Sequence, residues 1–155
     1  MRLIGLVAAA LAACAPAAYV EPTGDDAATL TIENQGPVVF GYELEPAAFL
    51  DAPACSGRLR MGQRVASSRG ATLRTHVPAG ADFTLALRAT GGGAAGADAC
   101  AAAVSFRPLA GGRYLAVFRV EEGKCEVTIL RQRALAAGGG RFPERQRSRR
   151  EPACL

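Results

Sequence analysis

The chain has 155 residues, of which 50% are hydrophobic, so it can bury one modest core, and a second domain is not expected. The formal net charge of +4 includes Arg2, and without its first residues the chain is only mildly basic. Nearly all of the positive charge is arginine, with Lys124 as the sole lysine, which indicates a GC-rich genome rather than selection for phosphate binding.

The first residues have the order of a bacterial secretory signal. Arg2 is followed by an apolar stretch over residues 3–10, which is shorter than the roughly 20 residues that span a bilayer. The next four residues, Leu11-Ala12-Ala13-Cys14, resemble the lipobox, whose cysteine receives a diacylglycerol and becomes the new N-terminus. We therefore expect a signal peptide over residues 1–13 and a lipoprotein that is anchored through Cys14, because several acyl chains on one residue hold essentially permanently.

The residue after the lipidated cysteine indicates a destination. In lipoproteins of Gram-negative bacteria, a residue other than aspartate at this position implies transfer to the outer membrane, and Ala15 stands here. The expected location is thus the cell envelope, at the outer membrane and facing the periplasm. The alternative is that Ala15-Pro16-Ala17 is an ordinary cleavage site, which would release a soluble protein without Cys14.

The segment over residues 14–28 is predicted to be a lipid-anchored tether. It is rich in Ala and Pro, contains Gly24-Asp25-Asp26 and has too little apolar periodicity to pack. Beyond it, apolar and polar residues alternate in short runs that Gly and Pro separate, which is strand periodicity. This pattern predicts an all-β fold, a single small antiparallel β-sandwich over residues 29–135. The seven expected strands are residues 29–33, 38–44, 72–77, 83–88, 103–107, 114–120 and 126–131.

The connections between the strands carry their own signals. Turns are predicted at residues 34–37, 78–80 and 110–112, where Gly, Pro and Asn gather, and the last of them is expected to close a hairpin. Residues 46–50 are predicted to form one helical turn, and residues 89–99 a flexible loop. The last three strands are expected to form a meander within one sheet.

Once Cys14 is set aside, four cysteines remain, and an exported chain is expected to hold them as disulfides. In the predicted meander, Cys100 and Cys125 lie at the same end of the sheet, which favours a bridge between them and leaves Cys55 to pair with Cys154. The other two pairings stay open. A metal site is not expected, because there is no Cys-x-x-Cys and His76 is the only histidine.

The last 20 residues, 136–155, form a Gly- and Arg-rich tail that is predicted to be extended or disordered, because it has almost nothing to bury. The arginines are expected to be solvated charges, and the alternative is a patch for anionic lipid headgroups. Nucleic acid is not an expected partner, since the tail has no interleaved aromatic residues for stacking.

A set of short segments carries a resemblance to known proteins. The segments are Val77-Pro78-Ala79-Gly80, Phe83-Thr84-Leu85, Cys100, Val104-Ser105-Phe106-Arg107-Pro108, Gly112-Arg113-Tyr114 and Cys125-Glu126-Val127. Together they resemble small, uncharacterised bacterial lipoproteins with an immunoglobulin-like or transthyretin-like β-sandwich. The likeness covers roughly residues 29 to 131. It implies the fold and the location, and it brings no catalytic residues.

Catalysis finds little support in the sequence. His76 lies in an alternating run and is expected to be a strand surface residue, there is no Gly-x-Ser-x-Gly, and neither Asp25-Asp26 nor Glu121-Glu122 has the setting of two carboxylates held across a cleft. We therefore predict no catalytic residue and no cofactor.

The predicted function is that of a non-catalytic binding or structural module of the envelope. Its expected partners are the membrane, through the N-terminal lipid, and another envelope protein that adds a strand at an open sheet edge. The alternatives are a secreted soluble binding protein and a hydrolase or redox enzyme of the envelope.

Overall fold

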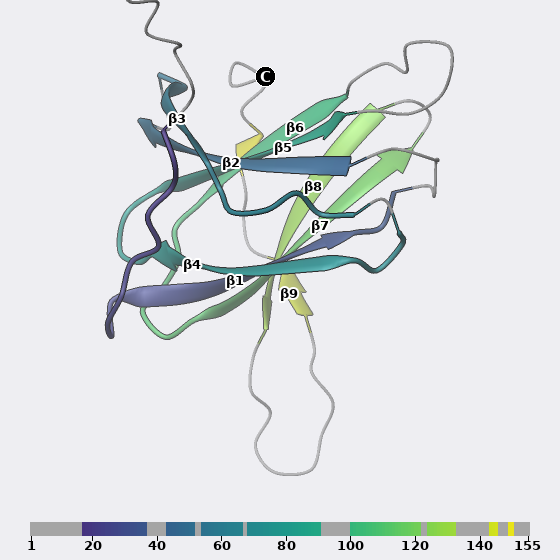
Figure 1. The fold of residues 1–155 in the computed structure, drawn as a ribbon. Helices are drawn as coiled ribbons and strands as arrows, with labels where there is room; N and C mark the ends of the chain where they lie inside the picture. Colours follow the sequence, from purple (N-terminus) through teal and green to yellow (C-terminus); the bar gives the residue numbers. More distant parts are fainter. Residues whose placement is uncertain are drawn as a thin grey trace, which may run out of the picture.

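Two five-stranded β-sheets make up the described part of the chain, which in this computed structural model comprises residues 17–36, 43–51, 54–66, 68–90, 100–121, 124–132, 143–145 and 149–150 (Figure 1). Within these residues there is no helix, and so none that could cross a membrane. The strands are β1 (Ala27–Asn34), β2 (Glu43–Asp51), β3 (Ser56–Arg60), β4 (Thr72–Pro78), β5 (Phe83–Thr90), β6 (Ala101–Phe106), β7 (Arg113–Glu121), β8 (Lys124–Gln132), β9 (Pro143–Arg145) and β10 (Arg149–Arg150).

The first sheet has the order β4-β1-β7-β8-β9, and the second has the order β10-β6-β5-β2-β3. Only β1 and β7 run parallel, while all other neighbouring strands are antiparallel. The chain crosses between the sheets after β1, β3, β4, β6 and β9, so neighbours in sequence are often not neighbours in a sheet. The predicted small antiparallel sandwich is confirmed, with this one parallel pair added.

The core lies between the two sheets and follows from the alternation that predicts the strands. Leu30 and Ile32 of β1 are fully buried, and the residues of β1 that alternate with them are only half-buried. Leu85 and Leu87 of β5 are also fully buried. Burying such side chains contributes about 1.5 to 3 kcal/mol each. This two-residue period explains why strands were the right prediction over most of the chain.

One local prediction is wrong: the segment over residues 46–50 is not a helical turn but part of β2. Its residues pair with β5, from Pro46 opposite Leu87 to Phe49 opposite Thr84. The strand tolerates Pro46 because of where the missing N–H would point. The carbonyl of Pro46 points towards Met61, just beyond the end of β3, and the missing N–H would point to the same side, where β3 has already ended. The interstrand pairing therefore overrides the local helical signal.

The predicted meander is also wrong. β6 lies in the second sheet and β7 in the first, so residues 110–112 connect two sheets instead of closing a hairpin. Cys100 and Cys125 nevertheless form a disulfide, with Cα atoms 5.7 Å apart. Because Cys100 immediately precedes β6 and Cys125 lies in β8, this bridge joins the two sheets.

Cys55, at the turn between β2 and β3, is disulfide-bonded as well. Its predicted partner Cys154 lies outside the described residues, as do Cys14 and the predicted signal peptide.

The tail over residues 136–155, which is predicted to be extended or disordered, contains two short strands. β9 pairs with β8 at the edge of the first sheet, and β10 pairs with β6 at the edge of the second. Both additions use the backbone N–H and C=O groups that an edge strand leaves open. Of the two predicted forms of the tail, extended or disordered, residues 143–145 and 149–150 take the extended one, and the sequence did not predict their pairing with the sheets.

The described part of the predicted tether, residues 17–28, packs on the sandwich. Ala18 forms a parallel bridge with Arg60 at the end of β3, and the chain then runs on past the sheets to the start of β1 (Figure 1). Tyr19 places its ring against Phe83, with ring centroids 6.3 Å apart. Residues 17–21, which we call the N-terminal segment, are thus a docked part of the domain.

Candidate anion site

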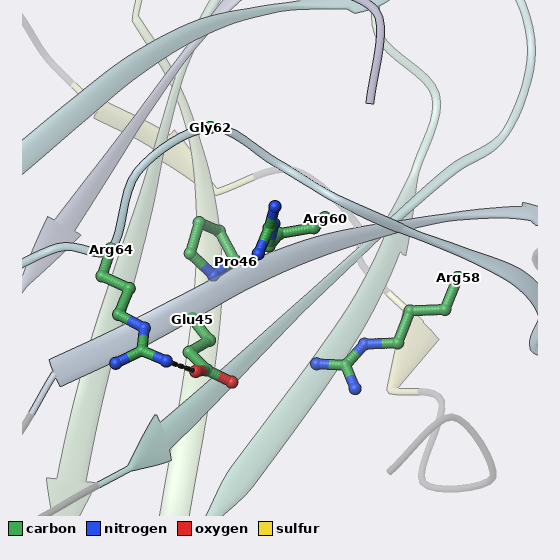
Figure 2. A pocket seen from close by; sticks show the side chains of 6 residues that line it. All are labelled: Glu45, Pro46, Arg58, Arg60, Gly62 and Arg64. Atoms are coloured by element: carbon green, nitrogen blue, oxygen red, sulfur yellow. Dashed lines mark ion pairs between the residues drawn. The ribbon is translucent and has the colours of Figure 1, made fainter. Parts of the chain in front are cut away.

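A hollow of about 170 Å³ lies beside β2 and β3, on the face of the second sheet that points away from the core (Figure 2). Three arginines dominate its wall, and one glutamate faces them. The lining residues are Glu45, Pro46, Arg58, Arg60, Gly62 and Arg64.

The pairing of β2 with β3 sets the direction of two of these arginines. Arg58 lies opposite Phe49 and Arg60 opposite Ala47, and directly opposed residues in a sheet share a face. Ala48, which lies between Ala47 and Phe49 on β2, belongs to the core between the sheets. Arg58 and Arg60 therefore project from the outer face, two residues apart along an edge strand.

The third arginine is placed by the short loop that follows β3. Met61 donates to the carbonyl of Pro46 at 3.0 Å, and Val65 exchanges two 2.9 Å backbone hydrogen bonds with Leu44. The side chains of Met61 and Val65 are buried, so the loop is pinned to β2 at both ends. Gly62 takes a φ of 53°, a left-handed conformation that suits glycine, and this turn returns Arg64 to β2.

Two carboxylates of β2 hold Arg64. Its guanidinium lies 2.8 Å from Glu43 and 2.6 Å from Glu45. The hydrogen bond that Arg64 donates to Glu43 and the charge of Glu45 raise the pKa of Arg64 above its ordinary value. These ion pairs are exposed and add little to stability, but they fix the direction of the side chain.

Arg58 and Arg60 are in a different state. Both are exposed, and among the described residues no carboxylate forms an ion pair with either of them. Their guanidinium N–H groups are therefore available as donors. With one glutamate against three arginines, the wall of the hollow carries a formal charge of +2.

An arginine pair of this kind suits a phosphate or carboxylate group. Guanidinium groups present N–H donors in a planar fork that matches two oxygens of such anions. The residues that line the hollow include no imidazole, thiol or hydroxyl group that could act as a nucleophile. The chemistry that the hollow supports is thus the binding of an anion.

No protein-family model and no curated protein matches this sequence. The sequence signals and the geometry of the hollow are the observations that bear on the function.

His76, the histidine considered for catalysis, lies on β4 with its side chain half-exposed. Its ring Nδ1 is 3.0 Å from Oε2 of Glu21, and its backbone N–H donates to the same oxygen at 3.0 Å. Tyr19 donates its hydroxyl to the His76 carbonyl at 2.9 Å. The groups around His76 thus secure the N-terminal segment to β4.

These contacts shift the pKa values of Glu21 and Tyr19. Burial raises the pKa of Glu21, but hydrogen bonds from the backbone and ring of His76 and from Thr75 outweigh it, so the net pKa is lowered. Burial and the charge of Glu21 raise the pKa of Tyr19 to about 12. Tyr19 is therefore a neutral hydroxyl donor at physiological pH.

The carboxylate pairs considered for catalysis are not brought together into a site. Asp25 and Asp26 lie in the turn that precedes β1, and Glu121 ends β7, while Glu122 lies outside the described residues. Over the described residues, no group of three His, Cys, Asp or Glu side chains could hold a metal ion.

Sequence reasoning missed the arginine hollow. The signal was present in Ser56-Gly57-Arg58-Leu59-Arg60, where the arginines alternate with the strand period. With one half-buried leucine, this run has too few apolar residues to be recognised as a strand.

Proposed function

We propose that the protein is a lipid-anchored protein of the bacterial envelope that acts as a non-catalytic binding module, with an anionic ligand in the hollow at Arg58 and Arg60. The observation that carries the binding role is that these two arginines, two residues apart on β3, line a hollow and have no carboxylate partner among the described residues. The anchor is supported by Leu11-Ala12-Ala13-Cys14, and Ala15 favours the outer membrane.

Addition of a partner strand at a sheet edge has less support. The N–H and C=O of His76, which point outward from the β4 edge, already bond to Glu21 and Tyr19. At the β3 edge, the N–H and C=O of Arg60 bond to Ala17 and Tyr19 in the same way. The N-terminal segment thus occupies part of each of these two edges, and a protein partner would have to use the remainder.

Intact mass and membrane fractionation test the anchor. We expect the protein from a bacterial host to carry the mass of a diacylglycerol and an acyl chain and to sediment with membranes, and we expect Cys14→Ala to lose both. A mature chain that begins near Ala18, unmodified and soluble, would show that the protein is secreted without an anchor.

Titration with inorganic phosphate, followed by NMR of the arginine side chains, tests the hollow. We expect saturable shifts at Arg58, Arg60 and Arg64, and we expect Arg58→Gln/Arg60→Gln to weaken phosphate binding as read from the shift that remains at Arg64. Arg74→Gln/Arg113→Gln is the matched control, since it removes the same charge from two exposed arginines of the first sheet. Arg74 lies opposite Thr31 and Arg113 opposite Thr29, and these threonines alternate with the core residues of β1. Equal weakening by both pairs would assign the effect to net charge and exclude a site at the hollow.

A further inference from the structure

The N-terminal segment begins directly beside the hollow. Arg60 donates its backbone N–H to the carbonyl of Ala17 at 2.9 Å, and Tyr19 donates its own N–H to the carbonyl of Arg60 at 2.9 Å. The same residue whose side chain lines the hollow therefore holds the first described residues of the chain through its backbone.

Contacts farther along fix this position. Tyr19 packs edge-on against Phe83 of the second sheet and bonds to His76 of the first, while Glu21 accepts two further hydrogen bonds from His76. The segment is thus tied to both sheets. Ala17 has a defined place at the edge of β3.

Chain length then limits how far the hollow can lie from the proposed anchor. Three residue steps separate Cys14 from Ala17, and an extended chain spans at most about 3.6 Å per step, so the two Cα atoms are at most about 11 Å apart. The headgroup layer on each side of a bilayer is about 5 to 8 Å thick. A lipidated Cys14 would therefore hold the edge of β3 at the membrane surface.

An exposed apolar side chain lies at the same edge. Val20, which is 84% exposed, directly follows Tyr19, whose N–H bonds to the carbonyl of Arg60. An exposed apolar residue beside arginines suits a surface that meets lipid headgroups.

We propose that the ligand of the hollow is the phosphate-bearing headgroup of anionic lipid in the membrane that carries the anchor. This inference rests on the proposed anchor and on the proposed anion site. The docked N-terminal segment turns the outer face of the second sheet at Arg58 and Arg60 towards the bilayer, and the guanidinium groups bind headgroup phosphates there. The hollow thereby fixes the orientation of the domain on its membrane.

Arginine footprinting of the lipidated protein tests this orientation. The protein is reconstituted into vesicles of phosphatidylcholine alone or of phosphatidylcholine mixed with phosphatidylglycerol, treated with phenylglyoxal, and analysed by peptide mass spectrometry. Each near-surface arginine is attracted to anionic lipid by an amount that corresponds to about a fivefold change in occupancy. We therefore expect Arg58 and Arg60 to react about fivefold more slowly in the mixed vesicles, with Arg74 and Arg113 unchanged.

Equal reaction rates of Arg58 and Arg60 in the two kinds of vesicle would overturn the inference. A parallel reaction of the unlipidated Cys14→Ala protein, with and without inorganic phosphate, then separates the two proposals. Protection of Arg58 and Arg60 by free phosphate alone would keep the anion site and reject the lipid headgroup as its ligand. Failure of phosphate as well would reject the anion site itself.

Discussion

The disulfide between Cys100 and Cys125 joins strands of opposite sheets, with Cα atoms 5.7 Å apart. Cys100 immediately precedes β6 in the second sheet, and Cys125 lies in β8 of the first. Both side chains pack against the main core. The bond therefore ties the two layers of the sandwich together at one end, independently of the hydrogen bonds within each sheet.

Removal of this bond is expected to destabilise the fold substantially. The bridge closes a segment with a sequence separation of 25 residues, for which the loss of chain entropy in the unfolded state amounts to about 3.5 kcal/mol. We expect Cys100→Ala/Cys125→Ala to lose about that much free energy of unfolding in urea titrations. A loss below about 1 kcal/mol would show that the sheets are held without this bond.

The pairing was predicted correctly, but through a wrong arrangement of strands. Alternation of apolar and polar residues identifies β6, β7 and β8, because strands of both sheets share the same two-residue period. The period does not say which sheet a strand joins. The turn over residues 110–112 fits a hairpin or a crossing between sheets equally well, so the sequence alone left the topology open.

Elements with few apolar residues were hardest to predict. β3 has only Leu59 as an apolar side chain, and β9 and β10 are built from charged residues and proline. These strands form because edge strands of the sandwich offer open backbone groups, which is a property of the assembled fold. The arginine hollow depends on β3 and on the loop after it, so it could not be found before the fold was known.

The contact between Glu21 and His76 is expected to be lost at low pH. Because the pKa of Glu21 is lowered in the folded chain, the contribution of its carboxylate is fully present above the ordinary value of 4.5 and is lost as the pH falls through the lower folded value. We expect the backbone N–H resonance of His76 to titrate with a midpoint below 4.5 when the pH is lowered.

Glu21→Gln provides the control for this titration, since an amide accepts a hydrogen bond but does not ionise. In this variant, the His76 N–H resonance should show no transition below pH 4.5. If the transition that Glu21→Gln removes has its midpoint at or above 4.5 in the unsubstituted protein, this would contradict the lowered pKa and the hydrogen bonds that explain it.

The hydroxyl of Tyr114 is expected to stabilise the crossing between β6 and β7. It accepts a hydrogen bond from the backbone N–H of Leu109 at 3.0 Å, and the Tyr114 side chain is almost fully buried. Tyr114→Phe leaves that N–H without its acceptor, which costs about 1 to 3 kcal/mol. Thermal or urea unfolding measures this loss.

Tyr19→Phe is the matched comparison for Tyr114→Phe, because it removes a hydroxyl that donates to the His76 carbonyl at a more exposed position. Water can replace that hydrogen bond, so the cost should stay below about 1 kcal/mol. Equal losses in the two variants would mean that the burial of the Tyr114 side chain does not decide the cost.

Glu45 is expected to weaken the attraction of the hollow for anions. Its carboxylate lines the hollow and pairs with Arg64 at 2.6 Å, so it both adds negative charge and occupies one of the three guanidinium groups. Removing one unit charge at a separation of several ångström in a solvent-exposed site corresponds to about 0.7 kcal/mol. We therefore expect Glu45→Gln to bind inorganic phosphate about threefold more tightly in the arginine NMR titration.

Asp82→Asn is the control for Glu45→Gln, because it neutralises a carboxylate in another exposed ion pair, with Arg107, that does not line the hollow. The two variants change the net charge of the protein by the same amount. If Glu45 acts locally, only Glu45→Gln should tighten binding, whereas a similar gain in both would trace the effect to net charge. Weaker binding in Glu45→Gln would instead mean that Arg64 must be held by its carboxylates in order to contribute to the site.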